Sequence, residues 1–567
     1  MRSTFMGLEA SKRGLFTQQT ALYTTGHNIA NANTAGYSRQ RVNMQPTLGF
    51  PGTGLNAPMT PGFIGTGVEA GSVQRIRDTF TDSQFRQESN KLGYWESRSS
   101  AISQMEDVLN EPSDYGLAKS MDEFWKSLQD LSVNPENGGA RAVVVQRGIA
   151  VADSFNYMHK SISEIKDNAA KEIGISLNNV NSILEQIGDL NRQITAIEPN
   201  GYMPNDLYDA RDNLLDELGQ FFPIETSNTP SGGNALKVAE GSVTVSIKLK
   251  DGTSLKVVDG NDFAQLRTSS VNKPIGDVTP DGAVKGFYLV QLDSNGNETL
   301  LDKNMNPTVG IDDDSDPLTP DVEVAEVHDI LNFYDLGKIK SLTNSYGYVS
   351  GTDTDPLTSV TSNIVKGLFP DMITKLNTMA KAFAEEFNRI HIGDGTTEYP
   401  KGSDINGRPG QAFFVDDNET DSNIDASNIY VSNEIIKDPG KIVASDSAPT
   451  VSPDDAEPGN GNFALKLANM KFENLSDLGE VSVQTYFQSV IGQLGVDGQQ
   501  ASRLMFNTAT LQQAVAERRA SVSSVSLDEE MTNMITFQQA YNASARMITV
   551  VDETLDKIIN GMGRVGN

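Results

Sequence analysis

An apolar residue recurs at every seventh position at both ends of this chain, each time in a segment whose composition favours a helix. The positions are Leu8, Leu15, Leu22 and Ile29 at the start and Leu527, Met534, Tyr541, Ile548, Leu555 and Met562 at the finish. A seven-residue apolar repeat keeps one stripe of a helix facing a partner. The two end segments are therefore predicted to be helices that pair with each other or with neighbouring copies, and these ten residues form a candidate assembly interface.

The length and charge of the chain limit its architecture and its partners. A chain of 567 residues is too long for one hydrophobic core, so about three or four domains are expected. The 45 Lys and Arg residues against 75 Asp and Glu residues give a net charge of −30, and residues 201–480 carry −25 of it. Nucleic acids and anionic membranes are polyanions, so neither is an expected partner. No apolar run reaches the roughly 20 residues that cross a bilayer.

Signals for catalysis and metal binding are weak throughout the sequence. The chain contains no cysteine, which excludes disulfides and thiolate chemistry, and its four histidines are widely separated. A glycine-containing stretch at 52–57 neither follows a predicted buried strand nor opens a helix, so a loop is favoured over a nucleotide site. The acidic runs at 312–316 and 416–421 lack the spacing of a calcium loop. We therefore predict no catalytic residue, no cofactor and no metal ligand, and expect that the protein is not an enzyme.

Hydrophobic periodicity predicts a multidomain α+β fold in which helices from both ends flank a β-rich insertion. Long helices are expected at 3–33, 78–110, 116–132, 138–197, 358–392, 482–525 and 527–562. Alternating apolar and polar residues within 224–350 favour antiparallel strands. The predicted domains are a terminal coiled coil of 1–60 with 525–567, a long-helix bundle of 61–222 with 356–400 and 476–524, an inserted β-rich outer domain of 223–355, and a segment of loops and short strands at 401–475 packed on the bundle or the outer domain.

Two terminal motifs resemble those shared by flagellar rod, hook and hook-associated proteins. The first is Asn28-Ile-Ala-Asn-Ala-Asn-Thr-Ala-Gly-Tyr-Ser-Arg39, and the second is Phe537-Gln-Gln-Ala-Tyr-Asn-Ala-Ser-Ala-Arg546. The residues of these motifs that we single out are Asn28, Asn31, Asn33, Gly36, Tyr37, Phe537, Gln538, Gln539, Tyr541 and Arg546. Further agreement lies at 65–76 and at 204–212. The resemblance covers roughly residues 1–220 and 360–567, and the spelling of the second motif favours members at the junction between hook and filament.

This resemblance implies a structural axial component of the bacterial flagellum that joins hook to filament by helical self-assembly through its terminal helices. The implied partners are further copies of the chain, the hook protein, a second hook–filament junction protein, and an export chaperone on the C-terminal helix. It also implies export through the flagellar type III apparatus to an extracellular location. The first ten residues do not have the pattern of a cleaved signal peptide, which agrees with that route.

Two alternatives remain open at this stage. A hook protein would be expected to lack both the long helix at 138–197 and the Arg211-Asp212 segment. A secreted adhesin or surface protein that uses a flagellar-type export signal would carry its activity within 224–475. That alternative predicts a pocket with convergent polar groups, for which the sequence offers no signal.

Overall fold

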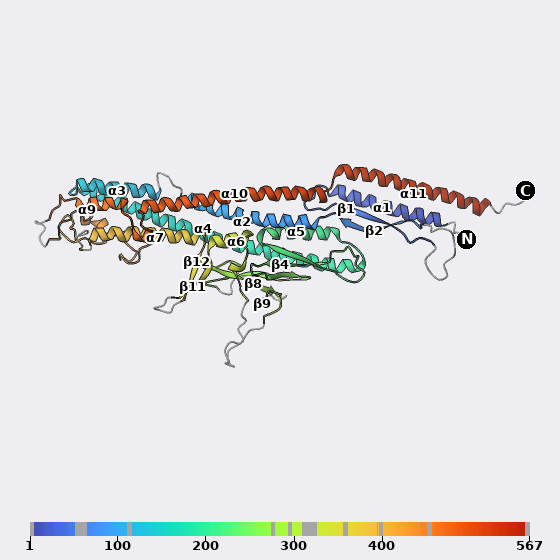
Figure 1. The fold of residues 1–567 in the computed structure, drawn as a ribbon, viewed down its shortest axis with the longest axis horizontal. Helices are drawn as coiled ribbons and strands as arrows, with labels where there is room; N and C mark the ends of the chain where they lie inside the picture. The colour runs from blue at the N-terminus through green and yellow to red at the C-terminus, as the bar shows by residue number, and fades with distance from the viewer. Residues whose placement is uncertain are drawn as a thin grey trace, which may run out of the picture.

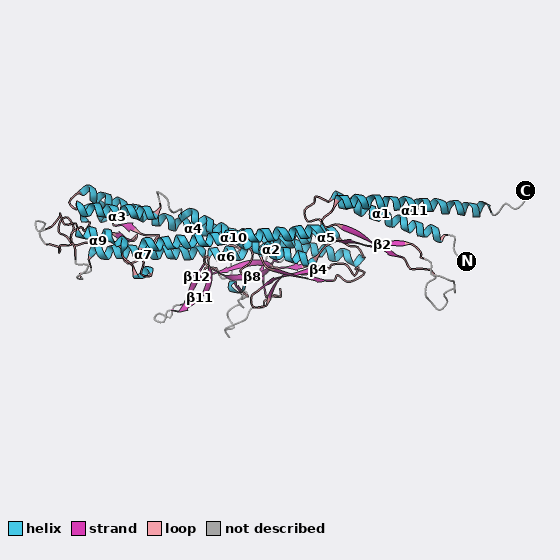
Figure 2. Ribbon diagram, turned by 45° about the horizontal axis from the view of Figure 1, so that its top comes forward, coloured by secondary structure: helices cyan, strands magenta, loops and turns pink. Residues whose placement is uncertain are grey.

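The molecule is a long helical rod with both chain ends at one extremity and a β-rich region on one side (Figure 1 and Figure 2). This computed structural model describes residues 5–50, 65–109, 116–273, 278–292, 298–308, 326–354, 361–393, 395, 401–450 and 456–561. The expected mixture of long terminal helices, further long helices and a β-rich region is confirmed. No described helix is both long enough and apolar enough to span a membrane.

Five long helices build the rod, and their packing follows from apolar stripes at helical spacing. They are α2 (Thr79–Leu109), α3 (Leu117–Val133), α4 (Gly138–Ile197), α7 (Leu368–Ile392) and α10 (Val483–Ser523). The side chain of Asn137 caps α4 by accepting hydrogen bonds from the N–H groups of Gly139 and Ala140. Along the second half of α4 the fully buried apolar residues are Ile173, Leu177, Val180, Leu184, Ile187 and Ile194. The helix α10 packs along α2, so segments far apart in sequence lie side by side.

An aromatic core closes the end of the rod that is far from the chain termini. Phe124 of α3 contacts four other phenylalanine rings at centroid distances of 5.4–6.3 Å, namely Phe383, Phe387, Phe413 and Phe414. These rings come from α3, α7 and the strand β13 (Phe414–Val415), which pairs with β14 (Tyr430–Val431). The short helices α8 (Asn433–Lys437) and α9 (Asn462–Asn469) lie in the same region. The segment 401–475 thus contributes side chains to this core.

The β-rich insertion contains two sheets. The first is antiparallel in the order β3-β4-β5-β6, with bounds Ile224–Thr229, Ser242–Lys248, Ser254–Asp259 and Asp262–Phe263. In the second, β8 (Val284–Leu292) pairs with β7 (Gln265–Ser270), β9 (Glu298–Leu301), β10 (His328–Asp329) and β11 (Tyr348–Thr354), and β11 also pairs with β12 (Thr361–Lys366). The helix α6 (Lys338–Tyr346) joins this region to the rod by packing on α2 and α4.

The insertion docks on α4 through residues that recur every seven positions and have small or amide side chains. A Cβ atom at Gly174 would lie 2.3 Å from Thr279 Oγ1, and one at Gly188 would lie 3.0 Å from the ring of Phe263. Between them, Asn181 accepts from the N–H of Leu266 at 2.7 Å and donates to its carbonyl at 3.1 Å. These contacts bring the sheet close to the helix backbone and satisfy buried polar groups of the strand.

Two helix predictions in the middle of the chain needed correction. The helix expected from 358 begins at Leu368, and residues 361–366 form β12 instead. Gly367, with φ of 153°, separates the two elements, and a Cβ there would lie 2.8 Å from Gly347 Cα. The helix α5 (Asn205–Phe221) had not been predicted, although it carries the 204–212 motif.

His391 ends α7 as a fully buried neutral side chain. Its Nδ1 lies 2.7 Å from the carbonyl oxygen of Gln411, and its Nε2 accepts a hydrogen bond from the N–H of Val443 at 2.9 Å. Burial, with a smaller contribution from Arg141, lowers the pKa of His391 to about 4. The imidazole of His391 takes up a proton more readily in the unfolded chain, where its pKa is near 6.5, than in the fold. The contribution of His391 to the free energy of unfolding is therefore fully present above pH 6.5 and is lost as the pH falls toward about 4.

We expect the variant His391→Gln to show a weaker pH dependence of the free energy of unfolding than the parent chain. Between pH 7 and pH 5, the parent should lose about 2 kcal/mol more stability than the variant, because one pKa unit corresponds to about 1.4 kcal/mol. Urea denaturation at both pH values measures the difference. Equal losses in the two proteins would show that His391 is not held neutral in the fold.

Candidate assembly surface

The helices at the two chain ends lie against each other in opposite directions. They are α1 (Met6–Ala30) and α11 (Leu527–Gly561), and the hairpin of β1 (Gln40–Pro46) and β2 (Val68–Arg75) packs on α1 (Figure 1). Gly7 faces Val551, Gly14 faces Ser544, and Asn28 contacts Glu530. The two helices are therefore antiparallel, and residues seven positions apart in α1 contact residues seven positions apart in α11 in the reverse order.

Residues with small side chains lie at the contact between these helices. We call Gly7, Gly14, Ala21 and Asn28 the small-residue seam, since they recur every seven positions, one position before the predicted stripe. A Cβ at Gly14 would lie 3.3 Å from Ser544 Oγ, and one at Gly7 would lie 3.7 Å from Val551 Cγ2. Small residues let two helix backbones approach closely, so the larger neighbours are displaced to the side of the contact.

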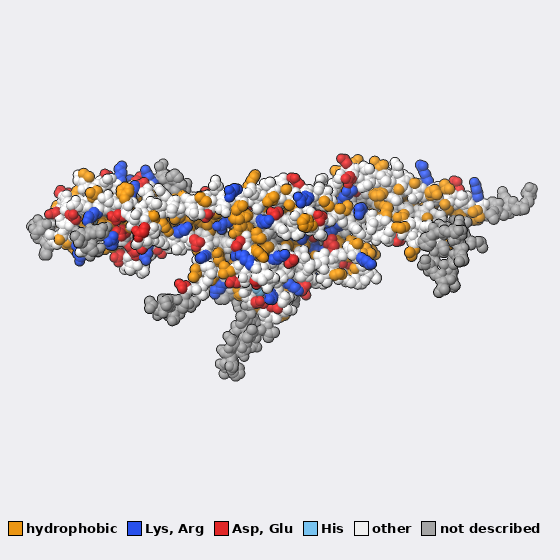
Figure 3. Space-filling model, in the orientation of Figure 1, with side chains coloured by type: hydrophobic (Ala, Val, Ile, Leu, Met, Phe, Trp, Pro, Cys, Tyr) orange, Lys and Arg blue, Asp and Glu red, His pale blue; other side chains and the backbone are white. Residues whose placement is uncertain are grey.

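The predicted stripe residues consequently differ in burial. Leu8, Leu15, Leu22, Ile29, Met534, Tyr541 and Ile548 are half-buried, whereas Leu527 is exposed and Leu555 is buried. Met562 lies outside the described residues. Other large apolar side chains of this pair are exposed, among them Phe16, Tyr23, Met531, Ile535, Met547, Val550, Ile558 and Ile559. Apolar side chains are visible along this part of the surface in Figure 3.

The motif residue Asn28 is at the centre of a buried hydrogen-bond network that fixes the end of α1. Its Nδ2 donates to the carbonyl of Gln40 at 2.8 Å and to Glu530 Oε2 at 3.0 Å. Its Oδ1 accepts from the N–H of Gln40 at 3.0 Å and from the hydroxyl of Tyr37 at 2.8 Å. Burial first, and then the nearby carboxylates of Asp206, Asp209 and Glu530, raise the pKa of Tyr37, so its hydroxyl keeps the proton that it donates.

Arg39 ties the N-terminal motif to the beginning of α11. Its Nε lies 2.8 Å from Glu530 Oε1, and its NH1 lies 2.5 Å from Glu529 Oε2. Glu530 is almost fully buried, and its other oxygen accepts from Asn28. The two ends of the chain, almost 500 residues apart, therefore share one buried carboxylate.

The remaining motif residues have more varied surroundings. Asn31 donates to the carbonyl of His27, and Gly36 adopts φ of 77° with no room for a Cβ beside Asn213. Asn33, Gln538, Gln539 and Arg546 are exposed, and Phe537 is half-buried. The structure thus gives Asn28, Gly36 and Tyr37 roles within the chain and leaves several residues of the C-terminal motif on the surface.

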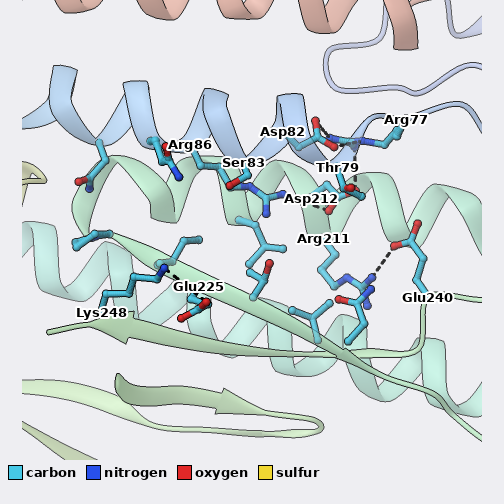
Figure 4. Close-up of a pocket in the computed structure, with 18 of the residues that line it drawn as sticks. Arg77, Thr79, Asp82, Ser83, Arg86, Arg211, Asp212, Glu225, Glu240 and Lys248 are labelled. Carbon is cyan, nitrogen blue, oxygen red and sulfur yellow. Dashed lines mark hydrogen bonds and ion pairs between the residues drawn. The ribbon is translucent and has the colours of Figure 1, made fainter. Parts of the chain in front are cut away.

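A second polar site joins the hairpin to the rod, and sequence reasoning missed it. We call it the arginine–carboxylate cluster: Arg75, Arg77, Arg86, Arg211 and Arg519 with Asp82, Asp209, Asp212, Asp216 and Glu240. Six of these residues are labelled in Figure 4, namely Arg77, Asp82, Arg86, Arg211, Asp212 and Glu240. Its members come from β2, the start of α2, α5, α10 and the segment between β3 and β4. The three aspartates and one arginine within 206–212 were the signal available in the sequence.

Asp212 is the centre of this cluster. It accepts from Arg75 and Arg77 at 2.9 Å each and from Arg86 at 3.4 Å. Burial raises the pKa of this carboxyl, but the guanidinium groups of Arg77, Arg75, Arg86 and Arg211 together outweigh burial and lower it. Asp212 is therefore held ionised between three cations.

The described residues contain no group of three or more His, Asp or Glu side chains arranged to hold a metal ion. Their polar clusters are made of ion pairs and hydrogen bonds that connect elements of the fold. This arrangement fixes the relative placement of the terminal helices, the hairpin and the rod.

Comparison with known proteins identifies the family. Flagellar hook-associated protein 1 of Bacillus subtilis (strain 168) is 40% identical to this chain over 567 residues, which is 99% of each. The chain belongs to the flagellar hook-associated protein 1 family. Relatives of that name from Salmonella typhimurium and Escherichia coli are 25% and 24% identical, and each comparison covers 96% of this chain and 98% of the relative.

Models of parts of the family agree with this result. Residues 102–286 match the flagellar hook-associated protein FlgK helical domain. Residues 8–37 match the flagella basal body rod protein, and residues 518–561 match the flagellar basal body rod FlgEFG protein C-terminal region. The flagellar hook junction protein FlgK from Burkholderia pseudomallei shares the fold, with a TM-score of 0.55 and 11% identity over 78% of this chain and 100% of that one. The chain is therefore a structural axial component of the flagellum.

Removing the central carboxylate of the arginine–carboxylate cluster should be strongly destabilising. We expect Asp212→Asn to lower the free energy of unfolding by roughly 3–5 kcal/mol, because it leaves buried guanidinium groups without their anion. The control Asp189→Asn breaks an exposed ion pair with Arg192, which should cost at most about 1 kcal/mol. Urea denaturation compares them, and similar losses would contradict the role given to Asp212.

The small-residue seam should tolerate no large side chain. Since the chain has no cysteine, two cysteines introduced at the exposed residues Phe16 and Asn542 can carry spin labels. We expect one short label distance in this parent, a longer and broader distribution with Gly14→Leu, and no change with Gly26→Leu, since nothing lies within 4 Å of a Cβ at Gly26. Unchanged distances in both variants would contradict the seam.

Proposed function

We propose that this chain joins the hook to the filament, and that it does so by helical self-assembly through the terminal helix pair. The observation that carries the proposal is the row of exposed apolar side chains on α1 and α11, which the described part of the chain leaves uncovered. Exposed apolar patches mark surfaces that associate with other proteins. The rod-protein models match these same two helices, which agrees with a contact shared by axial components.

The half-buried stripe supplies the second part of the proposed contact. Leu15, Leu22 and Ile548 are half-buried in the single chain. Neighbouring copies would complete their burial in a coiled-coil arrangement that lines the axial channel. Contacts between different surfaces of identical subunits propagate as a helical tube when the rotation does not close.

The two polar clusters support this proposal because they hold the assembling helices at a set orientation. The Asn28 network binds the end of α1 to α11, and the arginine–carboxylate cluster binds the adjoining hairpin to α2, α5 and α10. A terminal unit of 1–60 with 525–567 would then assemble while the long-helix bundle, the outer β-rich insertion of 223–355 and the segment at 401–475 stay outside the tube.

The proposal includes specific partners and an export route. The hook protein and a second junction protein would bind at the two ends of the helical assembly, and an export chaperone would cover the exposed apolar residues of α11 before secretion. Covering that surface would prevent association inside the cell. The chain would leave through the flagellar type III apparatus to an extracellular site.

Placing a charge in the predicted stripe should abolish incorporation without unfolding the rod. We expect cells carrying Leu22→Asp or Ile548→Asp to have hooks without filaments, as would cells lacking the protein, since burying an unpaired carboxylate costs several kcal/mol. Electron microscopy of the cells and assay of filament subunits in the medium measure the outcome. Gln186→Asp on an exposed position of α4 is the control, and normal filaments in either stripe variant would contradict the proposal.

A further inference from the structure

A cavity of about 640 Å3 lies between α2, α5 and the strands β3 and β4, where the rod meets the inserted sheet (Figure 4). Its volume is in the range of small-molecule sites, which commonly lie where two structural units meet. Six cationic side chains line it, namely Arg75, Arg77, Arg86, Lys91, Arg211 and Lys248, against the carboxylates of Asp82, Asp212, Glu225 and Glu240. Asp209, Asp216 and Glu88 do not line the cavity but also pair with these cations, so the charges around it are close to balanced.

Three buried polar atoms of residues that line the cavity have no hydrogen-bond partner in the part of the chain that the structure describes. They are Nε of Arg75, Nε of Arg211 and Oδ1 of Asn90. Arg211 is fully buried and Asn90 is 2% exposed. Buried donors in folded proteins are almost always satisfied. Two unpaired guanidinium N–H groups at one cavity therefore point to a missing acceptor.

Glu240 is the one carboxylate of the cluster that can be exchanged. It lies between β3 and β4 and is 31% exposed, whereas the four aspartates are carried by α2 and α5. It contacts both Arg75 and Arg211. Burial lowers the pKa of Arg211, and Glu240 and Asp212 only partly offset that effect. Even with Glu240 in place, Nε of Arg211 has no hydrogen-bond partner among the described residues.

Two lysines and three apolar residues also line the cavity. Lys91 pairs with Glu88 at 2.7 Å and Lys248 pairs with Glu225 at 3.5 Å, and both lysine side chains are more than 40% exposed. The pair of Lys248 with Glu225 is exposed on both sides and contributes little stability, so the ammonium group of Lys248 can turn toward another anion, whereas Lys91 pairs with Glu88, whose side chain is only 17% exposed. Leu215, Ile224 and Val243 line the same cavity and can cover carbon atoms of a ligand.

We propose that this cavity binds a small organic acid with two or three carboxylates. One carboxylate replaces Glu240 on Arg75 and Arg211, and a second is held by Lys91 and Lys248 at the rim. A carboxylate is the group expected because the resident acceptor is itself a carboxylate. The site is separate from the terminal helices and stands independently of the assembly function.

The test uses citrate as the probe and the purified full chain, titrated by calorimetry at constant ionic strength. We expect measurable binding, and expect Lys248→Glu to weaken it at least about tenfold, which corresponds to about 1.4 kcal/mol. The matched control is Lys256→Glu on the neighbouring strand β5, where Lys256 pairs with Asp259 and does not line the cavity. Its affinity should stay within about twofold of the parent.

A second variant removes the negative charge of Glu240, which would compete with citrate for Arg75 and Arg211. Glu240→Gln keeps the shape of the side chain but loses its charge, so citrate should bind more tightly than to the parent and should raise the melting temperature more. Absence of citrate binding to both the parent and Glu240→Gln would overturn the proposal. So would equal affinities of Lys248→Glu and Lys256→Glu, or binding of inorganic phosphate in place of citrate.

Discussion

The arginine–carboxylate cluster is the interaction on which the arrangement of this molecule depends. Asp212 alone holds three guanidinium groups that belong to β2, to the turn after it and to α2. Arg519 adds α10 by pairing with Asp82 and Asp216. Separating any of these elements would leave a buried charge without its partner, which is far more costly than breaking a surface pair. The hairpin, and with it the terminal helix pair, is therefore held firmly against the rod.

Small and amide side chains at seven-residue spacing make close contacts between elements at two places in the molecule. They occur in the small-residue seam between α1 and α11 and again on α4, where Gly174, Asn181 and Gly188 receive the inserted sheet. In each case glycine allows close approach, and an asparagine satisfies polar groups that the approach buries. The same spacing that predicts apolar stripes thus also positions the residues that make the tightest contacts.

The internal contacts determine which side chains remain on the surface of the terminal helices. The arginine–carboxylate cluster and the small-residue seam place polar and small side chains at contacts inside the molecule. Large apolar side chains such as Met547 and Val550 are exposed on the terminal helices. A hydrophobic surface presented on a firmly oriented support is suited to repeated contact between copies. In the rod, by contrast, the aromatic residues of α3 and α7 are buried within one chain.

The sequence by itself determined the long helices, the β-rich insertion between them and the flagellar family, because helical periodicity and the terminal motifs are local patterns. It predicted α4 at 138–197 with the bounds that the structure has. Three features became visible only in the folded chain. Gly14 faces α11, and Asn28 and Arg39 share the carboxylate of Glu530. Arginines that are distant in the sequence converge on Asp212. Those features depend on which backbones can approach and which buried charges can be compensated, and neither is encoded in the spacing of residues along a single segment.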